Sequence, residues 1–411
     1  MPEVEAKAGR APGEVASAGG IAGPWRDDLI ASLLATSLVF GLFLDGWNHI
    51  NLQNGALGSF FTIWHALLYA GFTATALWIV TRNPHLYGHG LAKPYYQKLF
   101  GIPVRYPLAI AGLGLATVGL IGDVGWHTAY GSESGVARVI APFHLFLFFG
   151  AALLIAAPLR SAWFAPAYYP RNLSLRTILP ALISLMLVTA VAAFMFQWLS
   201  AFLDWTPSLQ LGRVPVGLAG DKRIEGTVEL AGVARVLVTN LLLLAPLLLA
   251  LTRWRLPFPS ATFLFVGVAT MMSGLSEYRL GGSILAALAG GLACDLLVQL
   301  LRPSRARPAA VRTVAALTPA ALWITYFLVL RWIHGIVWPT DLWLGTVGLA
   351  ILTTLLVSFV VVPPTALEPL GEEEAGPGLL DEDVRRLLPA ALGRSGFAVD
   401  GAADATSAPD S

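Results

Sequence analysis

Long runs of apolar residues alternate with short polar segments along most of the chain. A hydrocarbon core about 30 Å thick requires roughly 20 apolar residues in a helix that crosses it. By this measure the pattern predicts an all-α polytopic membrane protein with the lipid bilayer as its main partner. We expect about ten transmembrane helices, at about 28–49, 57–81, 104–126, 136–158, 175–203, 230–252, 257–278, 281–301, 311–334 and 339–363.

Polar residues interrupt the first four apolar runs in a pattern that occurs twice. An Asp and a His four residues apart close one run, and a single His lies near the start of the next run. Residues four apart share a helix face, so each Asp and His can point at one spot, to which the following helix brings the third side chain. The first copy is Asp45, His49 and His65, and the second is Asp123, His127 and His144.

The match between the two copies extends to glycines. The three polar positions are offset by 78, 78 and 79 residues. Gly41 precedes Asp45 as Gly119 precedes Asp123, and Gly71 follows His65 as Gly150 follows His144. The first four helices are therefore predicted to form a tandem repeat of helical hairpins.

The composition agrees with the prediction of a membrane protein and excludes several classes of site. The chain is 56% apolar and only 12% charged, with a mean hydropathy of +0.68, which is outside the usual range of soluble globular proteins. Cys294 is the only cysteine, so one chain cannot form a disulfide framework or a thiolate metal cluster. We find no CxxCH haem-attachment motif and expect no nucleic-acid partner.

Charge placement predicts the orientation and the domain boundaries. If the amino terminus is inside, 19 of the 26 Lys and Arg residues fall in inner segments. The positive-inside rule then places both termini in the cytoplasm and both Asp/His clusters toward the outer face of the cell membrane. We expect a disordered cytoplasmic tail at 1–25, a duplicated four-helix metal-site region at 26–160, a six-helix membrane scaffold at 161–363 and an acidic cytoplasmic tail at 364–411.

The repeated Asp and His residues suggest a metal site. Ionisable groups in a membrane span are costly and are usually functional. Imidazole and carboxylate ligands suit Cu(II), Zn(II), Fe(II) or Mn(II), and two imidazoles with one carboxylate also compose the facial triad of non-haem iron oxygenases. Two mononuclear sites and one dinuclear site both fit the pattern. A structural network in which each Asp orients a His fits it too.

The Asp-x3-His pair followed by a His on the next helix resembles the metal motif of the C subunit of particulate methane and ammonia monooxygenases. The resemblance covers only the segments Asp45–His65 and Asp123–His144. It implies copper as the metal, with iron and zinc as alternatives, and a possible role as a metal-dependent membrane oxidoreductase or monooxygenase-like subunit. Such a role requires an electron-donor protein or other membrane subunits as partners.

Two other functions fit the same residues. One is a b-type haem electron-transfer protein that uses histidines such as His65 and His144 as axial ligands, although it leaves both Asp residues unexplained. The other is an ion or metal transporter, since internal repeats and intramembrane Asp and His occur there. His334 and Glu277 are weaker candidates for joining the site. Asp295 is expected to pair with an arginine such as Arg302.

Overall fold

Helices make up most of the residues that the computed structural model describes. The structure describes residues 19–52, 62–82, 97–99, 102–104, 106–131, 135–164, 173–204, 206–208 and 222–364. Its helices are α1 (Gly19–Asn51), α2 (Ile63–Thr81), α4 (Pro107–Tyr130), α5 (Ala137–Ile140), α6 (Pro142–Ile155), α7 (Ala157–Phe164), α8 (Leu175–Met195), the 3-10 turn η3 (Gln197–Leu199), α9 (Lys222–Arg253), α10 (Ser260–Gly274), α11 (Gly282–Leu301), α12 (Pro308–His334) and α13 (Thr340–Val361). A short antiparallel hairpin joins β1 (Gln97–Leu99) and β2 (Ile102–Val104).

The predicted all-α membrane architecture is confirmed, with a refined number of spans. Within the described residues, eight helices are long and apolar enough to cross a bilayer. The pair α6 and α7, which is bent by 43° at Ala156, just before Pro158, counts as a ninth if the two helices form one broken span. The remaining predicted span, 257–278, contains only the 15-residue α10, which is about 22 Å long and shorter than the hydrocarbon core. Pro259 precedes this helix, and a series of turns follows Gly274.

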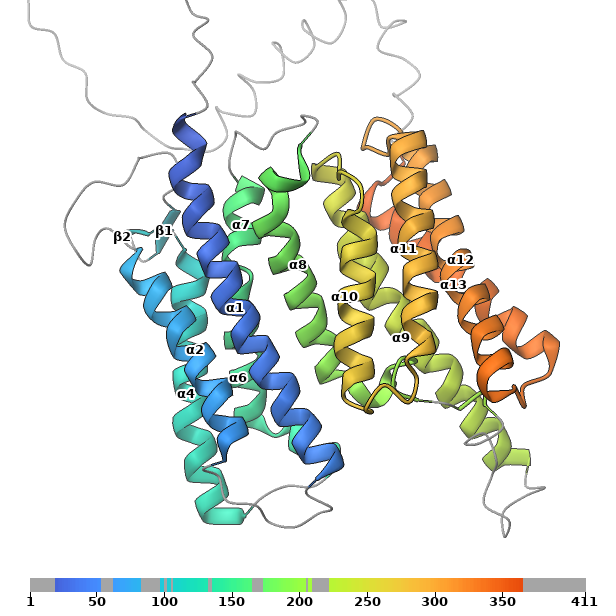
Figure 1. The fold of residues 1–411 in the computed structure, drawn as a ribbon, viewed down its shortest axis with the longest axis horizontal. Helices are drawn as coiled ribbons and strands as arrows, with labels where there is room; N and C mark the ends of the chain where they lie inside the picture. Colours follow the sequence, from blue (N-terminus) through green and yellow to red (C-terminus); the bar gives the residue numbers. More distant parts are fainter. Residues whose placement is uncertain are drawn as a thin grey trace, which may run out of the picture. The chain divides into compact units, whose positions relative to one another are not determined.

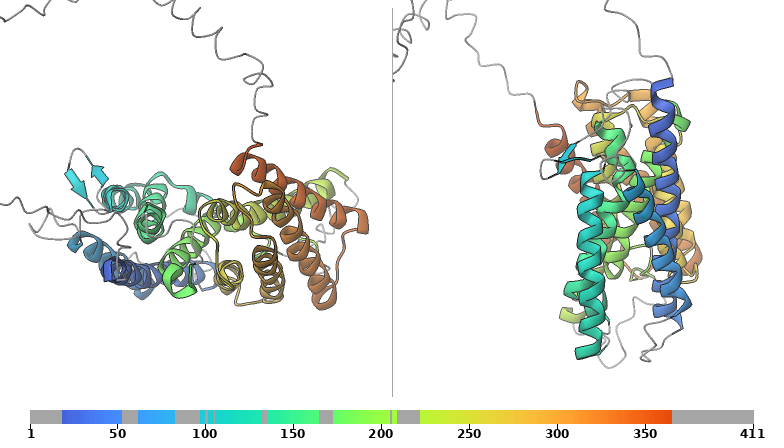
Figure 2. Two further views of the ribbon diagram at one scale, coloured as in Figure 1. Left: turned by 90° about the horizontal axis from the view of Figure 1, so that it is seen from above. Right: turned by 90° about the vertical axis from the view of Figure 1, so that its left-hand side faces the viewer.

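The helices follow one another as packed neighbours. The hairpin of α1 and α2 lies beside the hairpin of α4 and α6, and α8 contacts α1, α6, α9 and α10 (Figure 1). Helices α9 to α13 continue the packing beyond α8, as the views from above and from the side also show (Figure 2). Large apolar side chains remain exposed on the outer surfaces, such as Ile121 at 70% and Val360 at 82%. Lipid is the solvent that suits these surfaces.

Glycines set the close approach of α1 to α2. A methyl group added at Gly41 would lie 2.7 Å from the Cα of Leu68, and one added at Gly71 would lie 2.6 Å from the Cα of Leu38. Both distances are too short for any real side chain. The two backbones are therefore in direct contact, which small residues allow in membrane helix pairs.

The second hairpin, α4 with α6, has the same construction. A methyl group at Gly119 would lie 2.8 Å from the backbone nitrogen of Leu147, and one at Gly150 would lie 2.6 Å from that of Ala116. These glycines occupy the repeat positions of Gly41 and Gly71. The repeat thus preserves the contact points of the hairpin together with its polar residues.

A buried hydrogen-bond network joins three helices of the second half. The side-chain amide of Asn240 on α9 donates to the backbone oxygen of Ala350, at 3.1 Å, and to Thr354 Oγ1, at 2.7 Å, on α13. Trp323 Nε1 on α12 donates to Asn240 Oδ1, at 3.0 Å. Because Asn240 is fully buried and its amide is satisfied, it fixes the register of α9, α12 and α13.

The prediction that Asp295 pairs with an arginine was wrong. Asp295 on α11 pairs with no arginine of the described residues and instead accepts three hydrogen bonds from the start of α10. Its two carboxylate oxygens accept from the backbone N–H groups of Ala261 and Thr262, both at 2.9 Å, and from Thr262 Oγ1, at 2.7 Å. The first N–H groups of a helix lack partners within it and carry partial positive charge. Asp295 therefore caps α10 from a neighbouring helix.

We expect Asp295→Ala to lower the stability of the protein markedly. The change leaves the buried N–H of Ala261 and the partly buried N–H and hydroxyl of Thr262 unsatisfied, at up to about 1–3 kcal/mol each. Thermal unfolding of the detergent-solubilised protein measures the effect. Asp341→Ala, at an exposed position in the first turn of α13, is the matched control and should change the unfolding midpoint little. Equal midpoints for the two variants would contradict the capping role.

The predicted domain boundaries remain predictions. Most of the two predicted tails, residues 1–18 and 365–411, lies outside the described residues. Helix α1 begins at Gly19, within the segment predicted to be a tail. The described helices up to Pro363 belong to one compact unit, in which the two hairpins and the predicted scaffold pack together.

Candidate metal centre

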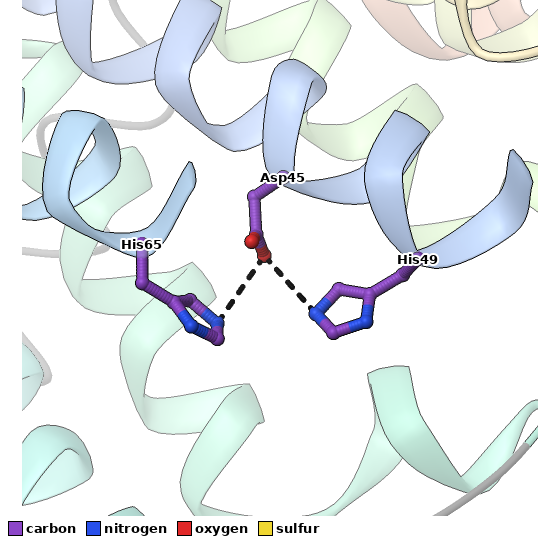
Figure 3. A group of neighbouring side chains, drawn as sticks. All are labelled: Asp45, His49 and His65. Carbon is purple, nitrogen blue, oxygen red and sulfur yellow. Dashed lines mark ion pairs between the residues drawn. The ribbon is translucent and has the colours of Figure 1, made fainter. Parts of the chain in front are cut away.

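Asp45, His49 and His65 converge at the end of the first hairpin. Asp45 and His49 lie one turn apart near the end of α1, and His65 lies in the first turn of α2. The Nε2 atoms of both histidines lie 3.5 Å from the same oxygen, Asp45 Oδ2 (Figure 3). The two rings are tilted, with centroids 5.7 Å apart. All three side chains thus direct a ligand atom at one point.

Asp123, His127 and His144 repeat this arrangement in the second hairpin. The Nε2 atoms of His127 and His144 lie 3.3 and 3.0 Å from Asp123 Oδ1. The ring centroids are again 5.7 Å apart. Helices α1 and α4 both run toward the lower end of Figure 1, so the two triads lie at the same end of the helices.

The local sequence places both second-helix histidines at the third residue of their helix. The side chain of Thr62 caps α2 by accepting from the backbone N–H of His65, at 3.1 Å. Pro142 is the first residue of α6, a position where its fixed φ suits a helix start, and His144 follows two residues later. Each histidine therefore projects from a defined first turn toward the end of the preceding helix.

The separations within each triad match those of ligands around one ion. A metal bound by histidine nitrogen and carboxylate oxygen at about 2.0–2.2 Å, with near-tetrahedral or octahedral angles, holds its ligand atoms about 3.0–3.5 Å apart. The four Asp–His distances span 3.0–3.5 Å. In both triads all three ligand atoms lie within 4.8 Å of one another. The geometry is that of a site that can hold a metal.

The carboxylates of Asp45 and Asp123 are largely buried, so their negative charges are unfavourable without a positive partner. The side chains of Asp45 and Asp123 are 11% and 6% exposed, and their histidines are about one-fifth exposed. Asp45 Oδ1 is buried and accepts no hydrogen bond. A buried carboxylate whose oxygen has no donor is unfavourable. A cation between Oδ2 and the two imidazoles would neutralise the negative charge of this carboxylate.

The second triad also defines a histidine tautomer. His127 Nδ1 lies 3.1 Å from the backbone oxygen of Gly131, which can only accept, so Nδ1 is the donor in this hydrogen bond. A neutral His127 then presents the lone pair of Nε2 to Asp123. Two lone pairs facing each other at 3.3 Å require a proton or a metal ion between them. Such outer contacts commonly orient histidine ligands.

Tyr69 is a residue of this region that the sequence analysis missed. It lies one turn after His65 on α2, is half-buried and stacks on the ring of His65 with centroids 6.0 Å apart. Its side chain is close enough to both Asp45 and Asp123 to interact electrostatically with each. The spacing of four residues from His65 was the available signal. The second repeat has Phe148 at the equivalent position, so only one copy carries the hydroxyl.

The weaker candidates lie outside the triads. Among the described residues, only the two triads bring three potential ligands together, and neither includes His334 or Glu277. Glu277 pairs instead with Arg279 at 3.3 Å in an exposed turn. The six predicted site residues group as three and three, and no group of six forms.

The comparisons with known proteins add no assignment. No protein-family model, curated protein or solved structure matches the chain. The candidate centre therefore depends on the geometry of its own residues. That geometry belongs to a polytopic membrane protein with two buried Asp/His/His triads that can bind metal.

Proposed function

We propose that the protein is an integral membrane metalloprotein in which each triad binds one transition-metal ion. The observation that carries the proposal is the recurrence, in both hairpins, of two imidazole nitrogens about one carboxylate oxygen at distances of 3.0–3.5 Å. A single triad of this kind can arise as a structural ion pair. Its repetition with the same helix positions and the same packing glycines favours a shared binding task.

Copper is the metal we propose, with iron and zinc as alternatives. Nitrogen and oxygen donors bind Cu(II) most strongly among the divalent first-row ions. The resemblance of the motif to the copper-binding residues of the C subunit of particulate methane and ammonia monooxygenases supports the same choice. Three protein ligands leave coordination positions for water or a small substrate, as in catalytic metal sites.

The bound metal would supply redox or Lewis-acid chemistry at the end of each hairpin where its first helix ends and its second helix begins. The chain's own residues perform the binding: Asp45 and Asp123 neutralise part of the ion's charge, and the histidines fix its position. Gly131 holds the His127 ring so that Nε2 faces the ion. An oxidoreductase reaction at these sites would take electrons from a partner protein. We place the sites toward the outer face of the membrane.

The haem electron-transfer and transporter functions account for fewer features of the two triads. A haem held by two histidines needs them on opposite faces of the macrocycle, whereas the imidazoles of each triad converge on one carboxylate oxygen. Transporter sites usually lie near the bilayer midplane in broken helices, whereas both triads lie at helix ends. A mononuclear metal site at each hairpin accounts for both Asp residues and all four histidines.

Metal content tests the proposal. We expect the detergent-purified protein, reconstituted with copper, to hold two copper ions per chain by elemental mass spectrometry. The variant with His49, His65, His127 and His144 all changed to alanine should hold none. His334→Ala removes a histidine outside both triads and is the control, which should retain both ions. Electron paramagnetic resonance should show nitrogen ligation in the control only.

Two outcomes would contradict the proposal. One is equal metal content in the four-histidine variant and the control, which would place the metal elsewhere. The other is a haem absorption band in the purified protein that disappears when these histidines are changed, which would move the function to electron transfer by haem. Iron or zinc bound in place of copper, with the same dependence on the four histidines, would retain the sites and change the metal.

A further inference from the structure

Arginines gather at the end of the helices opposite the triads. The segments 253–259, between α9 and α10, and 302–312, after α11, contain six arginines and no Asp, Glu or Lys. Both segments lie at the upper end of Figure 1, whereas the triads lie at the lower end. Arginine is the side chain best suited to bind phosphate, because its planar guanidinium donates two parallel hydrogen bonds.

A cavity of about 330 Å³ lies between these two segments. Its lining residues include two arginines, Arg255 and Arg302, together with Gln299. Leu251 and Phe258 contribute apolar walls, and Phe258 is 49% exposed. The cavity thus combines two cations with an apolar surface at the ends of membrane helices. This is the level at which lipid headgroups lie.

The two arginines of the cavity have no carboxylate partner among the described residues. Asp295 is the acidic residue nearest to Arg302 in the sequence, and its oxygens are occupied by hydrogen bonds from the start of α10. The ion pairs of the described residues include neither Arg255 nor Arg302. Two neighbouring cations without a counter-charge repel each other, and a bound anion removes that repulsion.

The backbone conformation at Arg302 does not favour an arginine, which indicates that the side chain has a role besides ending the helix. Arg302 ends α11 in the left-handed conformation, with φ of +49°, and its N–H donates to the backbone oxygen of Val298. This position favours glycine or asparagine. An arginine is disfavoured there by roughly 1–2 kcal/mol. A ligand bound by the guanidinium explains the choice, since strained positions cluster at binding sites.

We propose that this cavity binds the phosphate group of an anionic phospholipid, with Arg255 and Arg302 as the ligands of the phosphate. The apolar walls formed by Leu251 and Phe258 favour a lipid over free phosphate, because they can contact its glycerol and acyl groups. Basic pockets between membrane helices are known to bind acidic headgroups. The proposal is independent of the metal sites.

Lipid binding to the detergent-purified full chain tests the proposal. The cavity variant combines Arg255→Gln with Arg302→Asn, where asparagine suits the left-handed backbone. The control variant combines Arg305→Gln with Arg307→Gln, which removes the same charge from the same segment outside the cavity lining. Phosphatidylglycerol, phosphatidylcholine and inorganic phosphate are titrated separately, with the unfolding midpoint and native mass spectrometry as readouts.

We expect phosphatidylglycerol to bind and to raise the unfolding midpoint of the wild-type and control proteins. The cavity variant should need at least about ten times more of this lipid for the same shift, which corresponds to about 1.4 kcal/mol. Inorganic phosphate that protects as well as the lipid, again only with the cavity intact, would support the phosphate ligand and reject the lipid. An equal loss of lipid binding in the cavity and control variants would overturn the proposal that this cavity is the lipid site. Binding of phosphatidylcholine as strong as that of phosphatidylglycerol would also overturn it.

Discussion

A variant with His49 and His65 changed to alanine is expected to retain one of the two metal ions. The ligand atoms form two separate triads, so losing two ligands from the first triad empties that site and leaves the second complete. A single carboxylate, Asp45, cannot hold a transition metal tightly against a competing chelator. Elemental mass spectrometry after dialysis against a mild chelator measures the stoichiometry.

The mirror variant, with His127 and His144 changed to alanine, completes this experiment. It should also retain one ion, held by the first triad. Because Tyr69 stacks on His65 while the second repeat has Phe148 at the equivalent position, we expect the two remaining sites to differ in their spectra. Loss of both ions in either variant would show that the six residues build one shared centre. Retention of both ions in both variants would reject the triads as metal sites.

Much of this fold follows from hydropathy, because a bilayer allows few structures. Backbone groups in lipid must be satisfied within the helix, so a run of about 20 apolar residues has essentially one conformation. The exception is the segment 257–278. Its composition is mostly apolar, yet Pro259 and the turns after Gly274 limit α10 to 15 residues. The hydropathy of the segment carries no record of those turns.

The six residues of the candidate site were accessible from the sequence for a related reason. Asp45 and His49 are one helical turn apart, and a short hairpin must bring the start of α2 to the end of α1. The separation of the two triads was not accessible, because it depends on how α2 packs against α4 and α6. Asp295 illustrates the same limit. Two of its three hydrogen bonds come from backbone N–H groups of another helix, which leave no trace in the sequence.

The duplicated hairpin couples packing to chemistry. Gly71 lies six residues after His65, and Gly150 lies six residues after His144. Each glycine lets one helix backbone touch the other, and that contact sets the distance from the second-helix histidine to the Asp on the first helix. Metal ligation tolerates errors of only a few tenths of an ångström. The repeated glycines should therefore matter for metal affinity as well as for stability.

Gly71→Ala is expected to weaken the first metal site and to leave the second intact. The new methyl group would lie 2.6 Å from the Cα of Leu38, so α2 must move away from α1 and carry His65 from Asp45. Overpacking of this kind costs about 1–3 kcal/mol, more than the roughly 1 kcal/mol that alanine contributes as a better helix former. We expect at least about a tenfold loss of affinity at the first site, which corresponds to about 1.4 kcal/mol.

Two further glycine variants make this result specific. Gly150→Ala should affect the second site alone, since its methyl group would lie 2.6 Å from the backbone nitrogen of Ala116 on α4. Gly125→Ala is the matched control, because Gly125 lies between Asp123 and His127 and a methyl group there meets nothing within 4 Å. It should keep both metals and unfold at the same or a higher temperature. If Gly125→Ala weakened binding as much as Gly150→Ala, helix contact would not be what positions the ligands.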